Sequence, residues 1–478
     1  MDLKRRLDAL RRDAGSRDAA GSAVPARDPT NGAGAAGIGT PLGGPEMEPA
    51  PTKPAPLRNR LDRLAGRAAR GAGSGGGTRA AVSAEALAER FGGEVVAEHL
   101  VLVETLLPLH SRHGRLPLVD ALEPLWPLVP PSPTPPAQAG DGLRSPSLRT
   151  EEGSCALLRL AGEGPVVTEK ALHSAPGLRL LGIDTETTGL AGGTGTAAFM
   201  VGVAEPGPDG VRLRQWLLTA FAGEAAMLNE LERSLSTTDL LVSYNGKTFD
   251  LPLLRDRRRL QRAVALPEPS HLDLLHPTRR LFRAAWPDCR LATAERHLLG
   301  LVRDNDLPGS EAPRAWRDYL AGGPPEDLGR VLRHNALDLL SLLLLGPALA
   351  HALRDPEAFG ADPRAAAGLW ERHGEFNRAL AVLEGSRARL DTRGELELAW
   401  ALRRAGRWPE AEKIWERLAR DGCAEAVERL AKYHEHVRRD WSRALAYATR
   451  LEDGPDGRHR RDRLQRRLGA PQGQLDFS

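Results

Sequence analysis

Two carboxylates, Asp184 and Glu186, are spaced D-x-E directly after an apolar run at 178–183. Side chains two residues apart in a strand point to the same face of a sheet, so both acids would lie together at the end of a buried strand. Two carboxylates beside a hydrophobic core are costly unless a positive group joins them. Because carboxylate oxygens are the ligands that Mg²⁺ and Mn²⁺ prefer, the pattern predicts a divalent-cation site.

Two further acids complete this constellation. Asp250 stands in the segment S-Y-N-G-K-T-F-D-L-P-L-L, where a helix from about 249 to 261 is predicted to begin. Asp338 lies in a long apolar helix predicted from about 326 to 345, where a charge needs a partner or a chemical role. His334, four residues earlier, shares the same helical face. The structural alternatives to a catalytic role are a helix cap at Asp250, a salt-bridged core acid at Asp338 and a packing histidine at His334.

The segments between these acids predict the elements that must position them. Three more strands are expected at 197–204, 211–218 and 239–244, and residues 224–235 have helical periodicity. Nearer the N-terminus, a capped helix is expected at 83–91 and strand structure within 94–104. Strands first, followed by strand and helix in alternation, predict a mixed α/β sheet with helices on its faces.

The acidic segments resemble, in this order, the three exonuclease motifs of the DEDD superfamily of RNase H-like 3′–5′ exonucleases, and in particular the YprB-like group. The matching text is I-D-T-E-T-T-G-L-A-G-G-T-G-T, then S-Y-N-G-K-T-F-D-L-P-L-L, then H-N-A-L-D. Between the last two, S-H-L-D-L-L-H, L-A-T-A-E and D-L-P-G also resemble that group. The resemblance covers roughly residues 150–350 and implies an RNase H-like mixed sheet flanked by helices.

The resemblance also implies an activity, namely 3′–5′ exonucleolytic cleavage of DNA or RNA with two divalent cations, Mg²⁺ or Mn²⁺. Asp184, Glu186, Asp250 and Asp338 would hold the metals, and His334 would orient or deprotonate the attacking water. The chain departs from the family at this histidine. These enzymes place a tyrosine four residues before the last aspartate or a histidine five residues before it, so a packing role for His334 stays open.

Several other polar residues lie near the motifs. Asn245 and Lys247 are candidate substrate contacts. His271, Asp273 and Glu295 are expected to be structural or to support the metal ligands rather than to act in catalysis.

The rest of the chain predicts distinct regions. Phe376, Trp408 and Trp441 recur 32 and 33 residues apart, which resembles tetratricopeptide-type helix pairs. The expected regions are a disordered, basic, low-complexity segment at 1–80, a small ordered extension of the nuclease domain at 83–127, a proline-rich linker at 128–149, the RNase H-like domain at 150–350, all-α tetratricopeptide-like repeats at 360–450 and a basic tail at 454–478.

Composition bounds the class of protein. The 478 residues carry a formal net charge of only +3, and three cysteines, Cys155, Cys289 and Cys423, match no metal-ligand spacing. The N-terminus lacks the apolar core of a signal peptide. The most apolar stretch, 339–353, is interrupted by polar residues and a proline, so we expect a buried helix and no membrane span. These features predict a cytoplasmic protein.

The predicted partner is nucleic acid, DNA or RNA, and the C-terminal repeats suit a protein partner. The segment 474–477, Q-L-D-F, loosely resembles the peptide that docks on bacterial sliding clamps. Two alternatives to a nuclease are a catalytically inactive nucleic-acid-binding or scaffold protein on a nuclease fold, and an interaction protein centred on the repeats.

Overall fold

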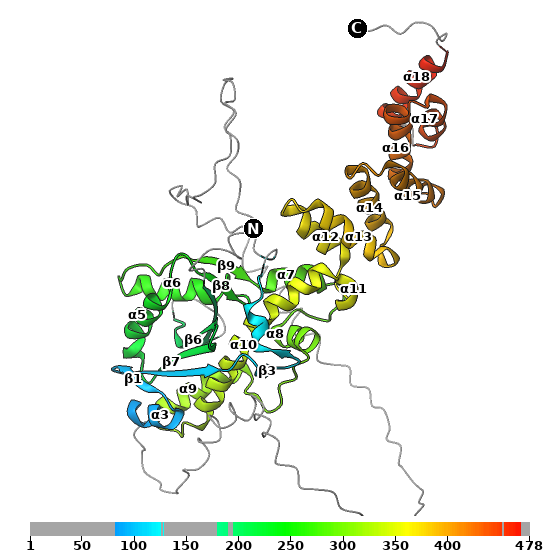
Figure 1. The fold of residues 1–478 in the computed structure, drawn as a ribbon. Helices are drawn as coiled ribbons and strands as arrows, with labels where there is room; N and C mark the ends of the chain where they lie inside the picture. Colours follow the sequence, from blue (N-terminus) through cyan, green and yellow to red (C-terminus); the bar gives the residue numbers. More distant parts are fainter. Residues whose placement is uncertain (1–81, 126–127, 129–178, 190–194, 452–453, 470–478) are drawn as a thin grey trace, which may run out of the picture. The chain divides into compact units, whose positions relative to one another are not determined.

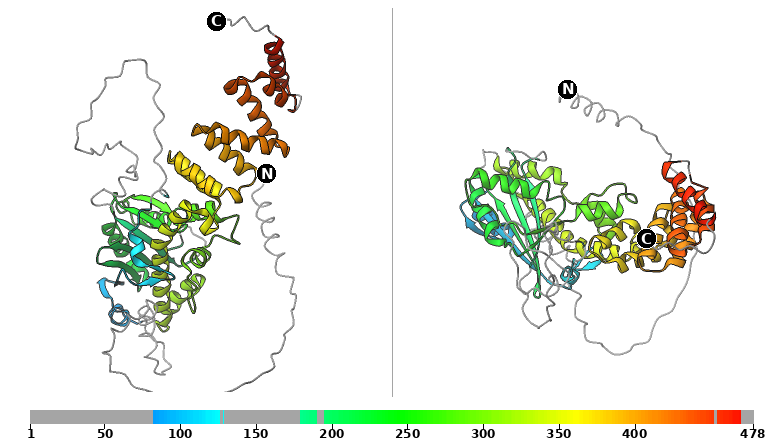
Figure 2. Two further views of the ribbon diagram at one scale, coloured as in Figure 1. Left: turned by 45° about the vertical axis from the view of Figure 1, so that its right-hand side comes forward. Right: turned by 90° about the horizontal axis from the view of Figure 1, so that it is seen from above.

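The structure is a computed structural model that describes residues 82–125, 128, 179–189, 195–451 and 454–469 (Figures 1 and 2). All of these belong to one compact unit of the chain. The predictions for 1–80, for nearly all of the proline-rich linker and for the clamp-like segment at 474–477 lie outside the described residues, as do residues 190–194 of the first motif.

A seven-stranded mixed sheet forms the centre of the fold, in the order β1-β2-β7-β6-β5-β8-β9 (Figure 1). Neighbours from β1 to β5 are antiparallel, whereas β8 and β9 run parallel to β5. The strands are β1 (Glu94–Ala97), β2 (Leu100–Leu107), β5 (Leu180–Thr187), β6 (Ala198–Gly207), β7 (Gly210–Leu218), β8 (Leu240–Ser243) and β9 (Ser270–Asp273); β3 (Arg112–His113) and β4 (Leu116–Pro117) form a separate pair. The mixed α/β sheet predicted from the sequence is confirmed.

Two details differ from the sequence-based expectation. The strand-type segment 94–104 is a hairpin of β1 and β2, because His99 adopts a positive φ of 63° and turns the chain. Strand β9 was not expected. It pairs with β8 over only four residues, too short a stretch for its alternation to stand out in the sequence.

Helices cover both faces of the sheet (Figures 1 and 2). Helices α3 (Ala84–Phe91), α5 (Glu224–Ser234), α6 (Asp250–Leu260) and α9 (Ala312–Leu320) share one hydrophobic core. On the other face, α7 (Leu275–Phe282) and most of α10 (Glu326–Arg354) form a second core. Short elements complete the domain: η1 (Leu118–Leu122), η2 (Phe221–Gly223), α8 (Leu291–Ala294), η3 (Glu295–Leu299) and η4 (Gly309–Glu311).

Helix α10 is the central helix of the domain. It continues through Pro347 to Arg354, so the helix predicted at 326–345 and the buried helix expected over 339–353 are one element; packing on all sides outweighs the lost backbone hydrogen bond. Among the described residues it is the one helix long and apolar enough to cross a membrane. However, 89% of its most apolar window is buried inside the protein, which is typical of a core helix.

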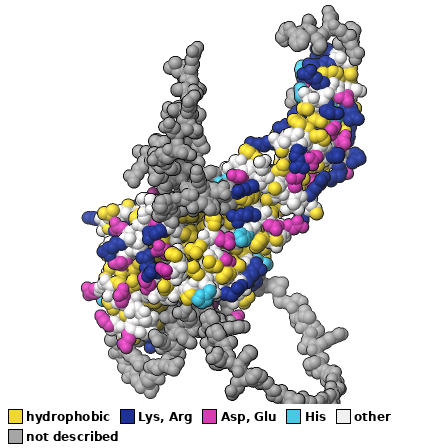
Figure 3. Space-filling view, viewed as in Figure 1, with side chains coloured by type: hydrophobic (Ala, Val, Ile, Leu, Met, Phe, Trp, Pro, Cys, Tyr) yellow, Lys and Arg dark blue, Asp and Glu magenta, His cyan; other side chains and the backbone are white. Residues whose placement is uncertain are grey.

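The C-terminal region is helical, as expected, with Phe376, Trp408 and Trp441 each as the first residue of a helix. Its core continues that of α10, since Trp370 Nε1 donates to the Leu353 carbonyl at 3.1 Å. Figure 3 shows Lys and Arg side chains recurring along these helices. The tetratricopeptide assignment stays a prediction. The elements are α11 (Pro356–Phe359), α12 (Pro363–Arg372), α13 (Phe376–Gly385), η5 (Arg387–Arg389), α14 (Thr392–Arg404), α15 (Trp408–Arg420), α16 (Ala424–Tyr433), η6 (His434–Arg438), α17 (Trp441–Ala448) and α18 (Pro455–Gly469).

Candidate active site

Strand β5 presents its two acids, Asp184 and Glu186, toward α10. Alternation along the strand places Gly182, Asp184 and Glu186 on one face. A Cβ added at Gly182 would lie 3.4 Å from a methyl group of Leu343 in α10, which identifies the helix that this face meets. The predicted same-face placement of the two carboxylates therefore directs them at the helix that carries the third motif.

Asn335 of α10 holds the Asp184 carboxylate in place and is itself held by Gln215 of the sheet. Asp184 pairs in register with Gly202 of β6, which pairs with Gln215 of β7. Gln215 Nε2 donates to Asn335 Oδ1 at 2.8 Å, and Asn335 Nδ2 donates to Asp184 Oδ2 at 2.7 Å. Gly202 leaves the necessary room, because a Cβ there would lie 2.2 Å from Asn335 Oδ1. Sequence reasoning missed Asn335, although a buried amide beside His334 in a leucine-rich helix was a signal for it.

Asp250 is the first residue of α6 and is buried. Phe249 occupies the N-cap position and makes no side-chain cap hydrogen bond, so the alternative of Asp250 as the N-cap is wrong. The hydroxyl of Thr185, on the other face of β5, donates to Asp250 Oδ1. This bond ties the second motif to the first.

His334 and Asp338, on one face of α10, lie beside Arg303, which sequence reasoning also missed. Arg303 forms ion pairs with Glu295, Asp338 and Asp306, the last at 3.1 Å. His334 lies within the same network, with Nδ1 donating to Asp306 Oδ2 at 2.7 Å and Nε2 3.7 Å from Asp338 Oδ2. Asp338 is thus ion-paired in this structure, as one alternative proposed.

The acids predicted for the site influence one another's pKa. Burial, followed by the charges of Asp338, Asp250 and Glu186, raises the pKa of Asp184 well above its ordinary value. Burial is also the main cause that raises the pKa of Glu186 to about 8 and that of Asp250 to about 6. Burial lowers the pKa of His334, but Asp338 and the other nearby acids outweigh it and raise the pKa to about 9. His334 therefore carries a proton near neutral pH, and its role as a base stays a prediction.

The three supporting residues have structural contacts, in line with expectation. The Asp273 carboxylate accepts hydrogen bonds from the backbone N–H groups of Asn245 at 2.7 Å and Lys247 at 3.0 Å. His271 Nε2 lies 2.8 Å from Ser243 Oγ, and burial, with the charge of Lys247, lowers its pKa to about 4. Glu295 binds Arg303. The contacts of Asp273 and His271 shape the loop that leads to Asp250, whereas Glu295 belongs to the Arg303 network.

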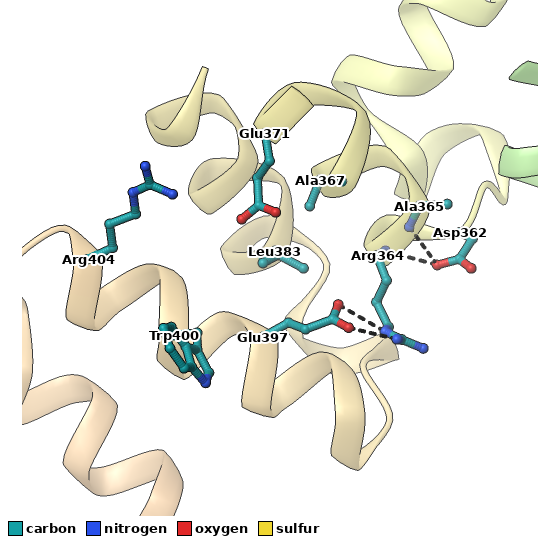
Figure 4. Close-up of a pocket in the computed structure, with 10 residues that line it drawn as sticks. Asp362, Arg364, Ala365, Ala367, Glu371, Leu383, Glu397, Trp400 and Arg404 are labelled. Atoms are coloured by element: carbon teal, nitrogen blue, oxygen red, sulfur yellow. Dashed lines mark hydrogen bonds and ion pairs between the residues drawn. The ribbon is translucent and has the colours of Figure 1, made fainter. Parts of the chain in front are cut away.

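A separate cavity of about 620 Å³ lies in the helical region and contains none of the predicted site residues (Figure 4). Figure 4 shows Arg364 of α12 reaching Glu397 of α14, with contacts of 3.0 and 2.7 Å. Trp400 and Arg404 line the same hollow. Because its best-placed charges neutralise each other, this cavity does not displace the carboxylates as the candidate active site.

The fold and the site together define a class. The mixed seven-stranded sheet with helices on both faces is consistent with an RNase H-like α/β fold, and β5, α6 and α10 carry the predicted acids. Comparison with known proteins supports this class. A family model described as the RNase H superfamily matches residues 181–350. The Bacillus subtilis (strain 168) protein called Uncharacterized protein YprB is 35% identical over 283 residues, which cover 55% of this chain and 67% of that protein. The chain belongs to the same family as YprB, within the RNase H superfamily, and this membership indicates a nuclease-type function.

RNase H-like nucleases typically use divalent metals, and the donor set here suits such ions. Asp184, Glu186, Asp250 and Asp338 offer only carboxylate oxygens, and their mutual repulsion in a buried site favours a shared cation. Within the part of the chain that the structure describes, no three such side chains are already placed as a formed metal site. The carboxylate oxygens therefore suit a divalent metal chemically. Their present positions do not form a coordination site, because Asp338 is paired with Arg303.

Proposed function

We propose that the protein is a metal-dependent nuclease that hydrolyses phosphodiester bonds of DNA or RNA, acting as a 3′–5′ exonuclease by a two-metal mechanism. The observation that supports it is the mutual electrostatic influence of Asp184, Glu186, Asp250 and Asp338, which three distant segments of the chain contribute. Burial and the neighbouring carboxylates raise the pKa of Asp184 and Glu186, so the four acids resist ionisation together, and bound cations would favour their charged forms.

Each residue has a distinct part in the proposed reaction. Asp184, Glu186, Asp250 and Asp338 would hold two divalent cations, Mg²⁺ or Mn²⁺. The bound cations would supply charge stabilisation and an activated water for in-line attack. Asn335 holds the Asp184 carboxylate in one orientation. His334, fixed through Nδ1 by Asp306, directs Nε2 toward Asp338 and is placed to transfer a proton at that nitrogen.

A catalytically inactive nucleic-acid-binding or scaffold protein is the second candidate. The observation that favours it is Arg303, which pairs with Asp338 and so neutralises one proposed metal ligand without any metal. In that case the Arg303 network would be a structural replacement for the cations. The two candidates differ in whether phosphodiester bonds are cleaved.

The test is cleavage of single-stranded and duplex DNA and RNA by the full-length protein. Each substrate carries a label at its 5′ end or its 3′ end, and reactions contain Mg²⁺, Mn²⁺ or EDTA. A 3′–5′ exonuclease releases the 3′ label at once as a mononucleotide and gives a shrinking ladder from the 5′ label. Internal cuts would make it an endonuclease. Binding without cleavage in either metal would establish the scaffold alternative.

A further inference from the structure

A second cavity lies beside the loop that leads to Asp250 and combines charged and apolar side chains. It has a volume of about 200 Å³ and is lined by Lys247, by His276 and Arg280 of α7 and by Arg372 of α12. The helix α12 is fixed there by the chain itself, since the Asp362 N–H at its start donates to the Leu281 carbonyl of α7 at 2.8 Å. Helix α12 of the C-terminal region thus shares a wall of this cavity with the RNase H-like domain.

The cavity has a strong excess of positive charge. Among the described residues, the side chains of Lys247, Arg280 and Arg372 are exposed and have no carboxylate partner. The acid in the lining is Asp273, which is 2% exposed and already accepts three backbone hydrogen bonds, from Asn245, Lys247 and Leu275. Its charge is therefore used to shape the loop, and the three cations remain available for an anion from solution.

The cavity also has an apolar floor. Leu272, Pro277 and Leu369 are buried and line it. A volume of about 200 Å³ is smaller than the ~300–1,000 Å³ of pockets that enclose whole small ligands. A phosphate with its attached sugar fits such a site, because the phosphate contacts the cations and the sugar contacts the apolar floor.

Position along the chain connects the cavity to the candidate active site. Lys247 stands three residues before Asp250 in a tight turn, in which the N–H groups of Thr248 and Phe249 both donate to the Asn245 carbonyl at 3.2 Å. Asn245 has a positive φ of 70° and Asp273 holds its N–H, so the turn is fixed. One fixed segment of the chain therefore joins the cavity to Asp250, the acid proposed as a metal ligand.

We infer that the cavity formed by Lys247, His276, Arg280 and Arg372 binds a backbone phosphate of a single-stranded polynucleotide and that α12 thereby belongs to the substrate-binding surface. The inference rests on the proposed function for its substrate. It goes beyond it by giving the C-terminal region a direct contact with nucleic acid. Cationic side chains that contact phosphates fix the register of a strand without reading its bases, so this binding is independent of sequence.

The test measures binding rather than cleavage. Fluorescence anisotropy of labelled single-stranded DNA and RNA is recorded with full-length protein in EDTA at several salt concentrations. The double variant Arg280→Ala/Arg372→Ala should bind more weakly than the wild type. It should also have a shallower dependence of log K on log salt, by about 0.7 for each phosphate that the variant no longer neutralises. Arg420→Ala is the matched control, since Arg420 is an exposed arginine at the end of α15 and distant in sequence from the cavity.

The outcomes separate this inference from the proposed nuclease activity. An unchanged salt slope in the double variant, or no binding of either strand by the wild type, overturns the inference whatever the cleavage assay gives. A reduced slope supports it even if the wild type cleaves nothing, in which case only the nuclease proposal fails. Inorganic phosphate and a mononucleotide are added as competitors. If inorganic phosphate or the mononucleotide at millimolar concentration displaced the labelled strand as completely as unlabelled strand does, the cavity would be a site for free phosphate. That result would overturn the assignment to a strand.

Discussion

Substitution of Arg303 tests directly whether its positive charge stabilises the folded protein by neutralising Glu295 and Asp338. Its side chain is 11% exposed and pairs with Glu295, whose side chain is 1% exposed, and with Asp338, which is 14% exposed. Arg303→Met keeps a side chain of similar length and removes the charge. The variant removes the cation that Glu295, Asp306 and Asp338 share. Buried Glu295 then loses its ion-pair partner, whereas His334 still lies beside the other two acids.

The magnitude follows from this burial. Removing one partner of a buried ion pair costs about 3–5 kcal/mol, because the remaining charge is uncompensated. Burial already raises the pKa of Glu295 above its ordinary value, and Arg303 opposes that shift. Without Arg303 the pKa of Glu295 rises further. An acid with a raised pKa in the folded state destabilises the fold above that pKa and ceases to do so as pH falls below its unfolded value. The deficit of Arg303→Met should therefore be larger at pH 8 than at pH 5.

The assay is chemical denaturation of the full-length protein in EDTA at these two pH values, followed by circular dichroism. Arg303→Lys, which retains a charge but not the planar fork, should lose less stability than Arg303→Met. Adding Glu295→Gln to Arg303→Met should recover at least about 1 kcal/mol, since the two side chains are in contact. A loss below about 1 kcal/mol for Arg303→Met, or the same loss at both pH values, would refute this reasoning.

Two further predictions concern residues around this network. Burial, together with Arg303, lowers the pKa of His113 to about 3, and its Nε2 lies 2.7 Å from Ser341 Oγ. Because the unfolded histidine takes up its proton near pH 6.5, folding stability should fall by about 2 kcal/mol from pH 7 to pH 5, and His113→Gln should remove that part of the decline in denaturation curves. Gly202→Ala should displace Asn335 and weaken Mn²⁺ binding by about 10- to 100-fold in calorimetric titration, whereas an unchanged affinity would show that Asn335 does not position Asp184.

The sequence predicted those parts of the fold that have a regular pattern. The apolar run before Asp184 and the leucine-rich helix around Asp338 were both found because buried strands and buried helices require continuous apolar residues. The face of β5 that carries Asp184 and Glu186 followed from strand alternation alone. Asp250 was correctly placed at a helix start, although the structure shows it inside the helix rather than capping it.

The rest of the site depends on contacts that have no local signal. Arg303 lies in an irregular segment after η3, and its partner Asp338 is 35 residues further along the chain, so no periodicity joins them. Asn335 and Gln215 pair only because β7 and α10 meet across the sheet. In each case tertiary packing, not propensity, determines which polar groups become partners.

The most direct test of the central claim is calorimetric titration of metal-free protein with Mn²⁺. The account predicts saturable binding in the wild type that is strongly weakened in Asp184→Asn and in Asp338→Asn. Each variant keeps the size and the hydrogen-bonding oxygen of the side chain but removes the ligand charge, and the exposed acid Asp421 supplies the matched control Asp421→Asn. Absence of Mn²⁺ binding by the wild type, or equal affinity in all the variants, would contradict the claim that these acids form a divalent-metal site.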